Sequence, residues 1–174
     1  MTDIAGFIAA RCPADHDLGQ EGCQTLALAL LEEEALWRPV VRHDPDVRFY
    51  HHLYRDPNVD VWVLCWLEGQ STGYHDHDRS EGGVVVCEGW LNEDYFSRGA
   101  DGLIYEKTNL HPTGGSFRFD ATYIHGVRHG GEGPGTSIHV YSPALWRMGH
   151  YEPDANGVIR RTSITYADDL LAVA

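Results

Sequence analysis

The 174-residue sequence has few basic residues, few cysteines and no long apolar run. Only 13 residues are Lys or Arg, against 26 Asp or Glu, so the formal net charge is −13 with histidine neutral. Such a charge opposes binding to phosphate backbones and anionic membranes unless basic groups cluster, and the sequence contains no basic cluster. We therefore expect neither a nucleic acid nor a membrane as a partner.

The apolar runs are too short for a membrane span. The longest, Leu26 to Leu31 and Val61 to Leu67, fall well short of the ~20 residues that a spanning helix needs. The N-terminus also lacks a basic region followed by an apolar segment, which is the pattern of a signal peptide. These absences predict a cytoplasmic protein.

The cysteines are too few to stabilise a chain of this length by disulfide bonds, and their spacing is not that of a metal site. We expect Cys12, Cys23, Cys65 and Cys87 to be reduced thiols, with Cys65 and Cys87 in the core. The sequence also has no repeat or low-complexity tract. Its length fits one domain, residues 1–174, that buries a core of its own.

The character of the chain changes after residue 38. Residues 1–38 have apolar residues at helical spacing, and a broad apolar stripe predicts a helix there. That stripe comprises Leu26, Leu28, Leu30, Leu31, Ala35 and Leu36. Residues 39–174 are rich in β-branched and aromatic residues between short turn signals, which is typical of a barrel or sandwich. We expect strands near 46–54, 59–67, 83–89, 92–96, 102–107, 115–119, 122–128, 136–142 and 157–163.

Two histidines stand two residues apart ahead of an apolar run. In a strand, His75 and His77 would share a face, so both imidazoles would point the same way. Two converging neutral imidazoles form half of a site for a borderline metal. The alternative is a pair of solvent-facing histidines on an acidic loop.

A third histidine, His125, lies in an alternating strand pattern about fifty residues after the first pair. His129 is the nearest competitor, but it stands beside glycines in a predicted turn. For His125 taken alone, a histidine with its hydrogen bonds satisfied in the core is the simpler interpretation.

Polar residues alternate with apolar ones further along the chain. Ser137, His139 and Tyr141 would share one face of a strand while Ile138 and Val140 pack behind it. Each polar group facing a core must find a partner or cost roughly 1–3 kcal/mol, so three together indicate a functional site. The alternative is an outward polar face.

The order of these motifs resembles the cysteine dioxygenase branch of the thiol dioxygenases, which are small cupins. The similarity runs from about Tyr50 to Met148 and includes Leu64-Cys65-Trp66 and Ser142-Pro143. The resemblance implies a mainly β cupin barrel (double-stranded β-helix, jelly roll) with N-terminal α-helices. It also implies a non-haem Fe(II) enzyme that adds O2 to the sulfur of a small thiol to give a sulfinic acid. A cis peptide before Pro143 is a further implication.

The resemblance assigns roles residue by residue. The Fe(II) ligands would be His75, His77 and His125, and the hydrogen-bonded relay beside the iron would be Ser137, His139 and Tyr141. Because the thiol supplies all the electrons, neither 2-oxoglutarate nor an external reductant is needed.

Two positions depart from the family pattern. Gly82 stands where the animal enzymes carry a cysteine crosslinked to the relay tyrosine, so no such crosslink to Tyr141 can form. The arginine that binds the substrate carboxylate falls near Tyr50, His51 or His52, and none of these is an arginine. The candidates to replace it are Arg48, Arg55 and Arg147. With Tyr50, His51 and His52 as the substrate-binding candidates there, the pocket would offer hydrogen bonds and a titratable charge instead of a permanent guanidinium. We therefore expect L-cysteine to be a poor substrate, and a different small thiol, or a cysteine-derived or imidazole-bearing one, to be preferred. The alternative is that one of the three arginines restores specificity for cysteine.

Two other interpretations stay open. Gly69, His75, His77 and Glu81 also fit the general cupin pattern, in which Glu81 would be a fourth metal ligand and the substrate would not be a thiol. The chain could also bind a small molecule without catalysis. In each case we expect a monomer or a small homo-oligomer.

Overall fold

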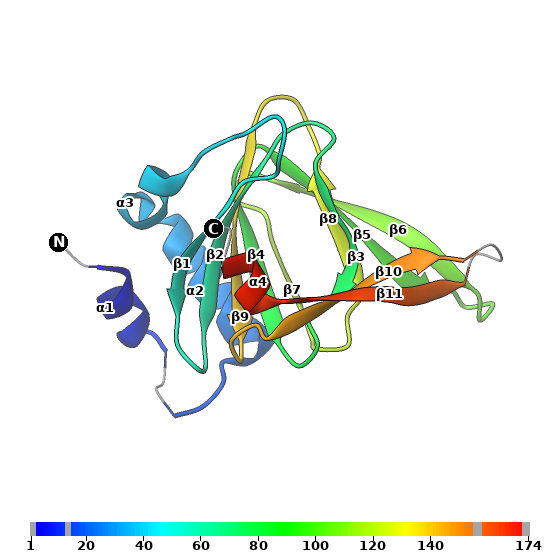
Figure 1. Ribbon diagram of the computed structural model, residues 1–174, viewed down its shortest axis with the longest axis horizontal. Helices are drawn as coiled ribbons and strands as arrows, with labels where there is room; N and C mark the ends of the chain where they lie inside the picture. Colours follow the sequence, from blue (N-terminus) through cyan, green and yellow to red (C-terminus); the bar gives the residue numbers. More distant parts are fainter. Residues whose placement is uncertain (1–2, 13–14, 155–157, 172–174) are drawn as a thin grey trace.

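The computed structural model describes residues 3–12, 15–154 and 158–171. Within these residues the strands form two antiparallel sheets, which face each other (Figure 1). The first sheet has the order β1-β2-β9-β4-β7, formed by Tyr50–Arg55, Asp60–Trp66, Gly135–Ser142, Glu81–Glu88 and Ser116–Phe119. The second has the order β11-β10-β3-β8-β5-β6, formed by Ile159–Tyr166, Arg147–Pro153, Ser71–Asp76, His125–His129, Trp90–Arg98 and Ile104–Pro112.

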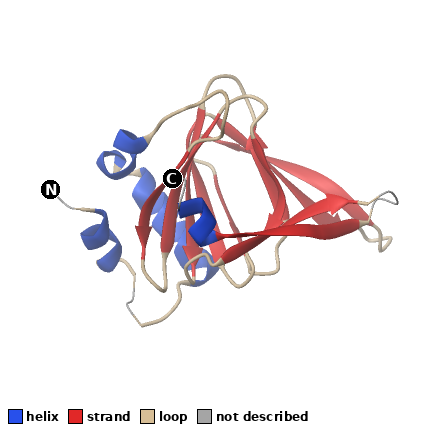
Figure 2. Ribbon diagram, in the orientation of Figure 1, coloured by secondary structure: helices blue, strands red, loops and turns tan. Residues whose placement is uncertain are grey.

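The helices are short and lie mostly at one side of the molecule. They are α1 (Ile4–Ala9), α2 (Gly19–Leu31), α3 (Glu34–Trp37), the 3₁₀ turn η1 (Arg38–Val40) and α4 (Ala167–Leu171). Figure 2 shows α1, α2 and α3 beside the outer face of the first sheet and α4 in front of that sheet. None of the helices in the described ranges is long and apolar enough to cross a membrane.

The three central strands of the first sheet, β2, β9 and β4, are buried along almost their whole length, whereas the outer strands β1 and β7 are only partly buried. In β2, Val61, Val63 and Cys65 pack toward the helices. The alternate residues Trp62 and Leu64 belong to a second cluster between the sheets. Because successive side chains of a strand point to opposite faces, β2 contributes residues to two separate apolar clusters.

Helix α2 packs against the first sheet with Cys23, Leu26, Ala27 and Leu30 buried. The contact is so close that a Cβ atom at Gly83 would overlap the backbone of α2, so only glycine fits there. The expected apolar stripe was wrong at two positions. Leu28 is 39% exposed because it lies on the face of α2 opposite Leu26 and Leu30. Ala35 is exposed because the chain turns between α2 and α3, so the stripe does not continue.

The expectation of a mainly β fold with N-terminal helices is confirmed. Each of the nine expected strands overlaps an observed one, but β3, β10 and α4 were missed. β3 is rich in glycine and polar residues, so its sequence is typical of a loop. It forms a strand because β8 and β10 pair with its two edges.

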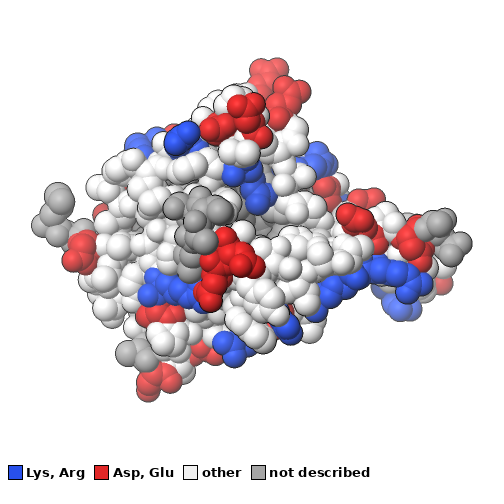
Figure 3. Space-filling view, in the orientation of Figure 1, with Lys and Arg blue, Asp and Glu red and all other residues white. Residues whose placement is uncertain are grey.

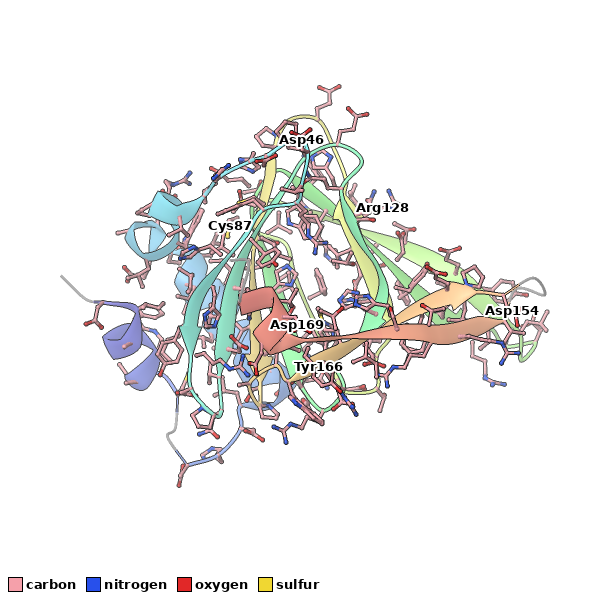
Figure 4. All side chains as sticks on the ribbon, viewed as in Figure 1. Asp46, Cys87, Arg128, Asp154, Tyr166 and Asp169 are labelled. Atoms are coloured by element: carbon pink, nitrogen blue, oxygen red, sulfur yellow. The ribbon has the colours of Figure 1, made fainter. Side chains whose placement is uncertain are left out.

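All four cysteines are free, and the described structure explains how they should react. Burial raises the pKa of Cys23 and of Cys87 to about 12 and also raises those of Cys65 and Cys12, but Cys12 is only half-buried. Cys87 lies on the helix side of the first sheet (Figure 4).

We expect a thiol-alkylating reagent near neutral pH to label Cys12 before the other three, since the thiolate is the reactive form. Intact mass of the native protein should show one slow addition, and full labelling should need a denaturant. Early labelling of Cys23 or Cys87 would contradict this packing.

Candidate metal centre and cavity

Three histidines converge between the two sheets. His75 lies in β3, His77 directly follows that strand and His125 begins β8, where it pairs with His75 across the ladder. One nitrogen of each lies within 4.8 Å of the others, and all three side chains are buried. β3 ends at Asp76, so only the first histidine of the pair is inside the strand, yet the rings of His75 and His77 are 4.7 Å apart.

The hydrogen bonds of two of these rings decide which nitrogen is free. Nδ1 of His75 lies 3.0 Å from the carbonyl oxygen of Gly73, which can only accept, so this nitrogen carries the hydrogen. Nδ1 of His125 similarly faces Oε1 of Glu93 at 3.2 Å. In the neutral tautomers with this hydrogen, Nε2 of each ring is the nitrogen free to bind a metal. Outer partners of this kind orient histidines that bind metals, so these residues fit a metal ion.

The third ring is held by stacking. His77 lies on the ring of Phe119, with centroids 4.4 Å apart, and its Nδ1 is buried with no hydrogen-bond partner among the described residues. Burial lowers the pKa of His77 and of His75 well below the ordinary value, and the neighbouring histidines lower both further. The low pKa keeps the rings neutral, which is the form that binds metals.

Glu81 lies apart from this cluster. Its Oε2 accepts a hydrogen bond from the amide of Gln20 at 2.6 Å, near the start of α2. Within the described chain, the group of side chains able to hold a metal comprises the three histidines without Glu81. This arrangement favours three nitrogen ligands over the alternative with a carboxylate.

A chain of hydrogen bonds runs along β9 beside the histidines. Nε1 of Trp66 donates to Oγ of Ser137 at 2.9 Å. That hydroxyl lies 2.9 Å from Nε2 of His139, and Nδ1 of His139 lies 3.3 Å from the hydroxyl of Tyr141. Ile138 and Val140 pack on the other face of the strand, so the three polar residues share the inward face.

The direction of this chain follows from its first member, because an indole N–H only donates. Ser137 accepts from Trp66, and its own buried hydrogen then has Nε2 of His139 as its acceptor. Burial lowers the pKa of His139 to about 3, so the ring is neutral and its hydrogen sits on Nδ1. His139 therefore donates to the Tyr141 oxygen, which leaves the phenolic hydrogen free to point into the cavity.

A cavity opens next to His75, His139 and Tyr141. Its other described lining residues are Arg48, Tyr50, Trp62, Leu64, Thr72, Leu145, Met148, His150 and Leu170. α4 covers this region, and the Tyr50 hydroxyl donates to the Leu170 carbonyl at 3.4 Å. None of the described lining residues is acidic.

Arg48 is the permanent cation among the described lining residues. Its Nη1 donates to the Ser71 carbonyl at 2.9 Å, and its guanidinium lies 5.0 Å from the Trp66 ring centroid. Its Nε is buried without a hydrogen-bond partner within the described chain. Burial lowers the pKa of Arg48, yet a guanidinium stays protonated, so it favours an anion in the cavity.

The other candidates for substrate binding lie outside the described lining. His52 donates to Asp60 at 2.9 Å, and Arg55 donates to the Leu145 carbonyl at 2.8 Å. Arg147 pairs with Asp78 at 3.1 Å. His51 points to the opposite face of β1 from Tyr50, because neighbouring strand residues alternate.

Sequence reasoning missed His150, Met148 and Thr72 in the cavity wall. His150 reaches it because β10 pairs with β3 and sets this residue opposite His75. Its Nε2 lies 2.9 Å from the Thr165 hydroxyl. Met148 and His150 are two residues apart, so in a strand they would share a face. No strand was expected in this segment, so the spacing was not used.

Gly82 stands where the family's crosslinked cysteine would be. It lies opposite Tyr141 on β9 and opposite Phe119 on β7. A Cβ atom at this position would overlap the Phe119 ring, which in turn stacks on His77. The ring of Phe119 therefore fills the space beside Gly82. The Ser142–Pro143 peptide is cis, as the resemblance implies.

Charged side chains are spread over the surface rather than gathered around the cavity. Figure 3 shows Lys and Arg at separate places on one face, with Asp and Glu between them. An exposed acidic group lies over α4, which contains Asp168 and Asp169.

Comparison with known proteins agrees with the site. The family described as cysteine dioxygenase type I matches residues 16–153. Cysteine dioxygenase type 1 from Bos taurus is 25% identical over 137 residues, which is 75% of this chain and 68% of the bovine one.

Solved structures give the fold. A cupin superfamily protein from Desulfitobacterium hafniense has a TM-score of 0.50 and 9% identity, over 62% of this chain and 87% of that one. A protein from Thermus thermophilus has a TM-score of 0.49 and 20% identity, and the match covers 62% of this chain and 93% of that one. The expected cupin fold is thus confirmed. Since the family match spans most of the chain and includes all three histidines, the chain belongs to the cysteine dioxygenase type I family.

Proposed function

We propose that the protein is a non-haem Fe(II) dioxygenase that adds both atoms of O2 to the sulfur of a small thiol. The thiol RSH and O2 together give the sulfinic acid RSO2H, and the sulfur loses all the electrons that O2 gains. The proposal is carried by one observation: three buried histidines converge beside a cavity that Tyr141 also lines. Iron held by these rings would favour the thiolate and bring the sulfur and O2 together.

The residues of the chain hold and orient the substrate. Tyr141, held by His139 and Ser137, keeps its phenolic hydrogen available for a group of the substrate in the cavity. Burial raises the pKa of Tyr141, so its hydroxyl stays protonated and donates. Apolar side chains around the cavity exclude water, which strengthens these interactions.

The lining of the cavity indicates the class of thiol. Arg48 offers a positive charge to a carboxylate, whereas none of the described lining residues offers an acid to an ammonium group. A mercapto acid without an amine fits this lining better than the zwitterion L-cysteine or the cation cysteamine. We therefore propose a small mercaptocarboxylate, such as 3-mercaptopropionate, as the preferred substrate.

The test combines metal analysis with oxygen uptake. The protein purified and loaded with Fe(II) should bind one iron per chain and consume one O2 per sulfinate formed. Values of kcat/KM for 3-mercaptopropionate, L-cysteine and cysteamine should rank in that order. Absence of sulfinate with every thiol would refute the activity, and a roughly tenfold preference for L-cysteine would refute the proposed substrate class.

Tyr141→Phe should keep the fold and the metal but lower turnover severalfold, because it removes only the hydroxyl at the end of the relay. Oxygen uptake and sulfinate formation should be measured together, since loss of the hydrogen bond would also let O2 use exceed product. A variant with full turnover would reduce the polar face of β9 to a structural role.

A further inference from the structure

Glu93 is a buried carboxylate behind the histidine cluster. It lies in β5 and is 2% exposed. Oε1 lies 3.2 Å from Nδ1 of His125, and Oε2 lies 3.1 Å from Nε2 of His111. Asn109 and Tyr123 add further hydrogen bonds.

A carboxylate is expensive to bury unless hydrogen bonds satisfy its charge. Each oxygen of the Glu93 carboxylate faces an imidazole nitrogen, of His125 or of His111, and hydrogen bonds from these two rings satisfy its charge. The residue is therefore anionic in the folded protein, directly behind one of the three clustered rings.

The three histidines differ in what stands behind them. His75 donates to a neutral backbone carbonyl, and His77 stacks on an aromatic ring. His125 donates to the carboxylate of Glu93. An anionic acceptor polarises the imidazole and makes its other nitrogen a stronger donor to a metal, as well as fixing the orientation of the ring.

The outer side of Glu93 is held by His111. This ring stacks on Phe117 with centroids 4.5 Å apart, so it cannot swing freely. With Oε2 bound by His111, the carboxylate cannot rotate away from His125. The connection from β6 through β5 to β8 is therefore rigid.

We propose that Glu93 is a positioning residue that sets the metal affinity of the site by holding Nδ1–H of His125. The proposal rests on the proposed function, in that a divalent metal binds the three histidines. It goes beyond that function because it assigns the strength of binding to a residue outside the ligand set, and it predicts that His125 is the ligand most sensitive to its surroundings.

The test compares two changes of carboxylate to amide at adjacent positions. Glu93→Gln keeps the shape but removes the charge behind His125. The matched control is Asp94→Asn, because Asp94 points to the other face of β5 and pairs with Arg128 at 2.7 Å, on the outer side of the second sheet (Figure 4). Affinity for Fe(II) is measured without oxygen by competition with a chelator.

Glu93→Gln should weaken Fe(II) binding by about 10- to 100-fold, and Asp94→Asn should leave it unchanged. Unchanged affinity in Glu93→Gln, with metal binding intact in the unmodified protein, would overturn this proposal alone. If the unmodified protein takes up no metal, the proposed function itself fails.

A second measurement needs no variant and covers the case in which Glu93→Gln does not fold. The nitrogen NMR spectrum of the metal-free protein should show His125 protonated on Nδ1 and bare on Nε2. The opposite tautomer would mean that Glu93 does not hold this ring as proposed. A role in packing alone would not fix the tautomer.

Discussion

Replacing His77 with alanine should abolish iron binding, whereas Glu81→Gln should leave one iron per chain. The first change removes one of three converging nitrogens, and the two that remain cannot hold the ion tightly. The second change alters a carboxylate whose oxygen accepts from the Gln20 amide rather than facing the histidines. Elemental analysis after loading with Fe(II) and gel filtration measures both.

Thermal unfolding of the metal-free proteins serves as the control for this pair. Glu81→Gln should lose a little stability, because an amide oxygen accepts less strongly than a carboxylate at the start of α2. His77→Ala should fold, since the cluster lies between sheets that pack without it. Loss of iron in Glu81→Gln with retention in His77→Ala would place the carboxylate in the metal site.

Removing the charge of Arg48 should lower kcat/KM for 3-mercaptopropionate by roughly 10- to 100-fold, the range expected for a charged hydrogen bond. Arg48→Gln keeps a hydrogen-bond donor on a shorter side chain but loses the cation of the cavity lining. Turnover of cysteamine, which has no carboxylate and carries a positive charge, should not fall. The difference between the two substrates separates loss of recognition from loss of structure.

Arg147→Gln is the matched control for Arg48→Gln. Arg147 pairs with Asp78 and is not among the described residues that line the cavity, so this variant should keep the substrate ranking. If Arg147→Gln rather than Arg48→Gln abolished the use of 3-mercaptopropionate, the substrate carboxylate would bind at the other side of β10.

The sequence was most informative where a short period determines which way side chains point. The spacing in Ser137, His139 and Tyr141 predicted a shared inward face, and these residues are joined by hydrogen bonds. The pair His75 and His77 could be recognised with the help of the family pattern, even though β3 itself was missed. Local alternation thus revealed the residues without requiring every strand to be assigned.

Residues that reach the site through pairing between distant strands were harder to predict. His150 lines the cavity because β10 lies beside β3, and Glu93 meets His125 because β5 lies beside β8. Neither strand pairing can be predicted from the residues adjacent in sequence to His150 or Glu93. Arg48 was one of three arginines with equal standing in the sequence, and only the folded barrel distinguishes it from Arg55 and Arg147.

The tight fit of Phe119 against Gly82 limits how this site could change during evolution. A cysteine at position 82 cannot be accommodated while the ring of Phe119 occupies that space, and moving the ring would release His77 from its stacked position. Any side chain at position 82 therefore also changes the packing of Phe119 on His77. Positions 82, 119 and 77 are coupled, so a substitution at the first acts on the histidine cluster through the second.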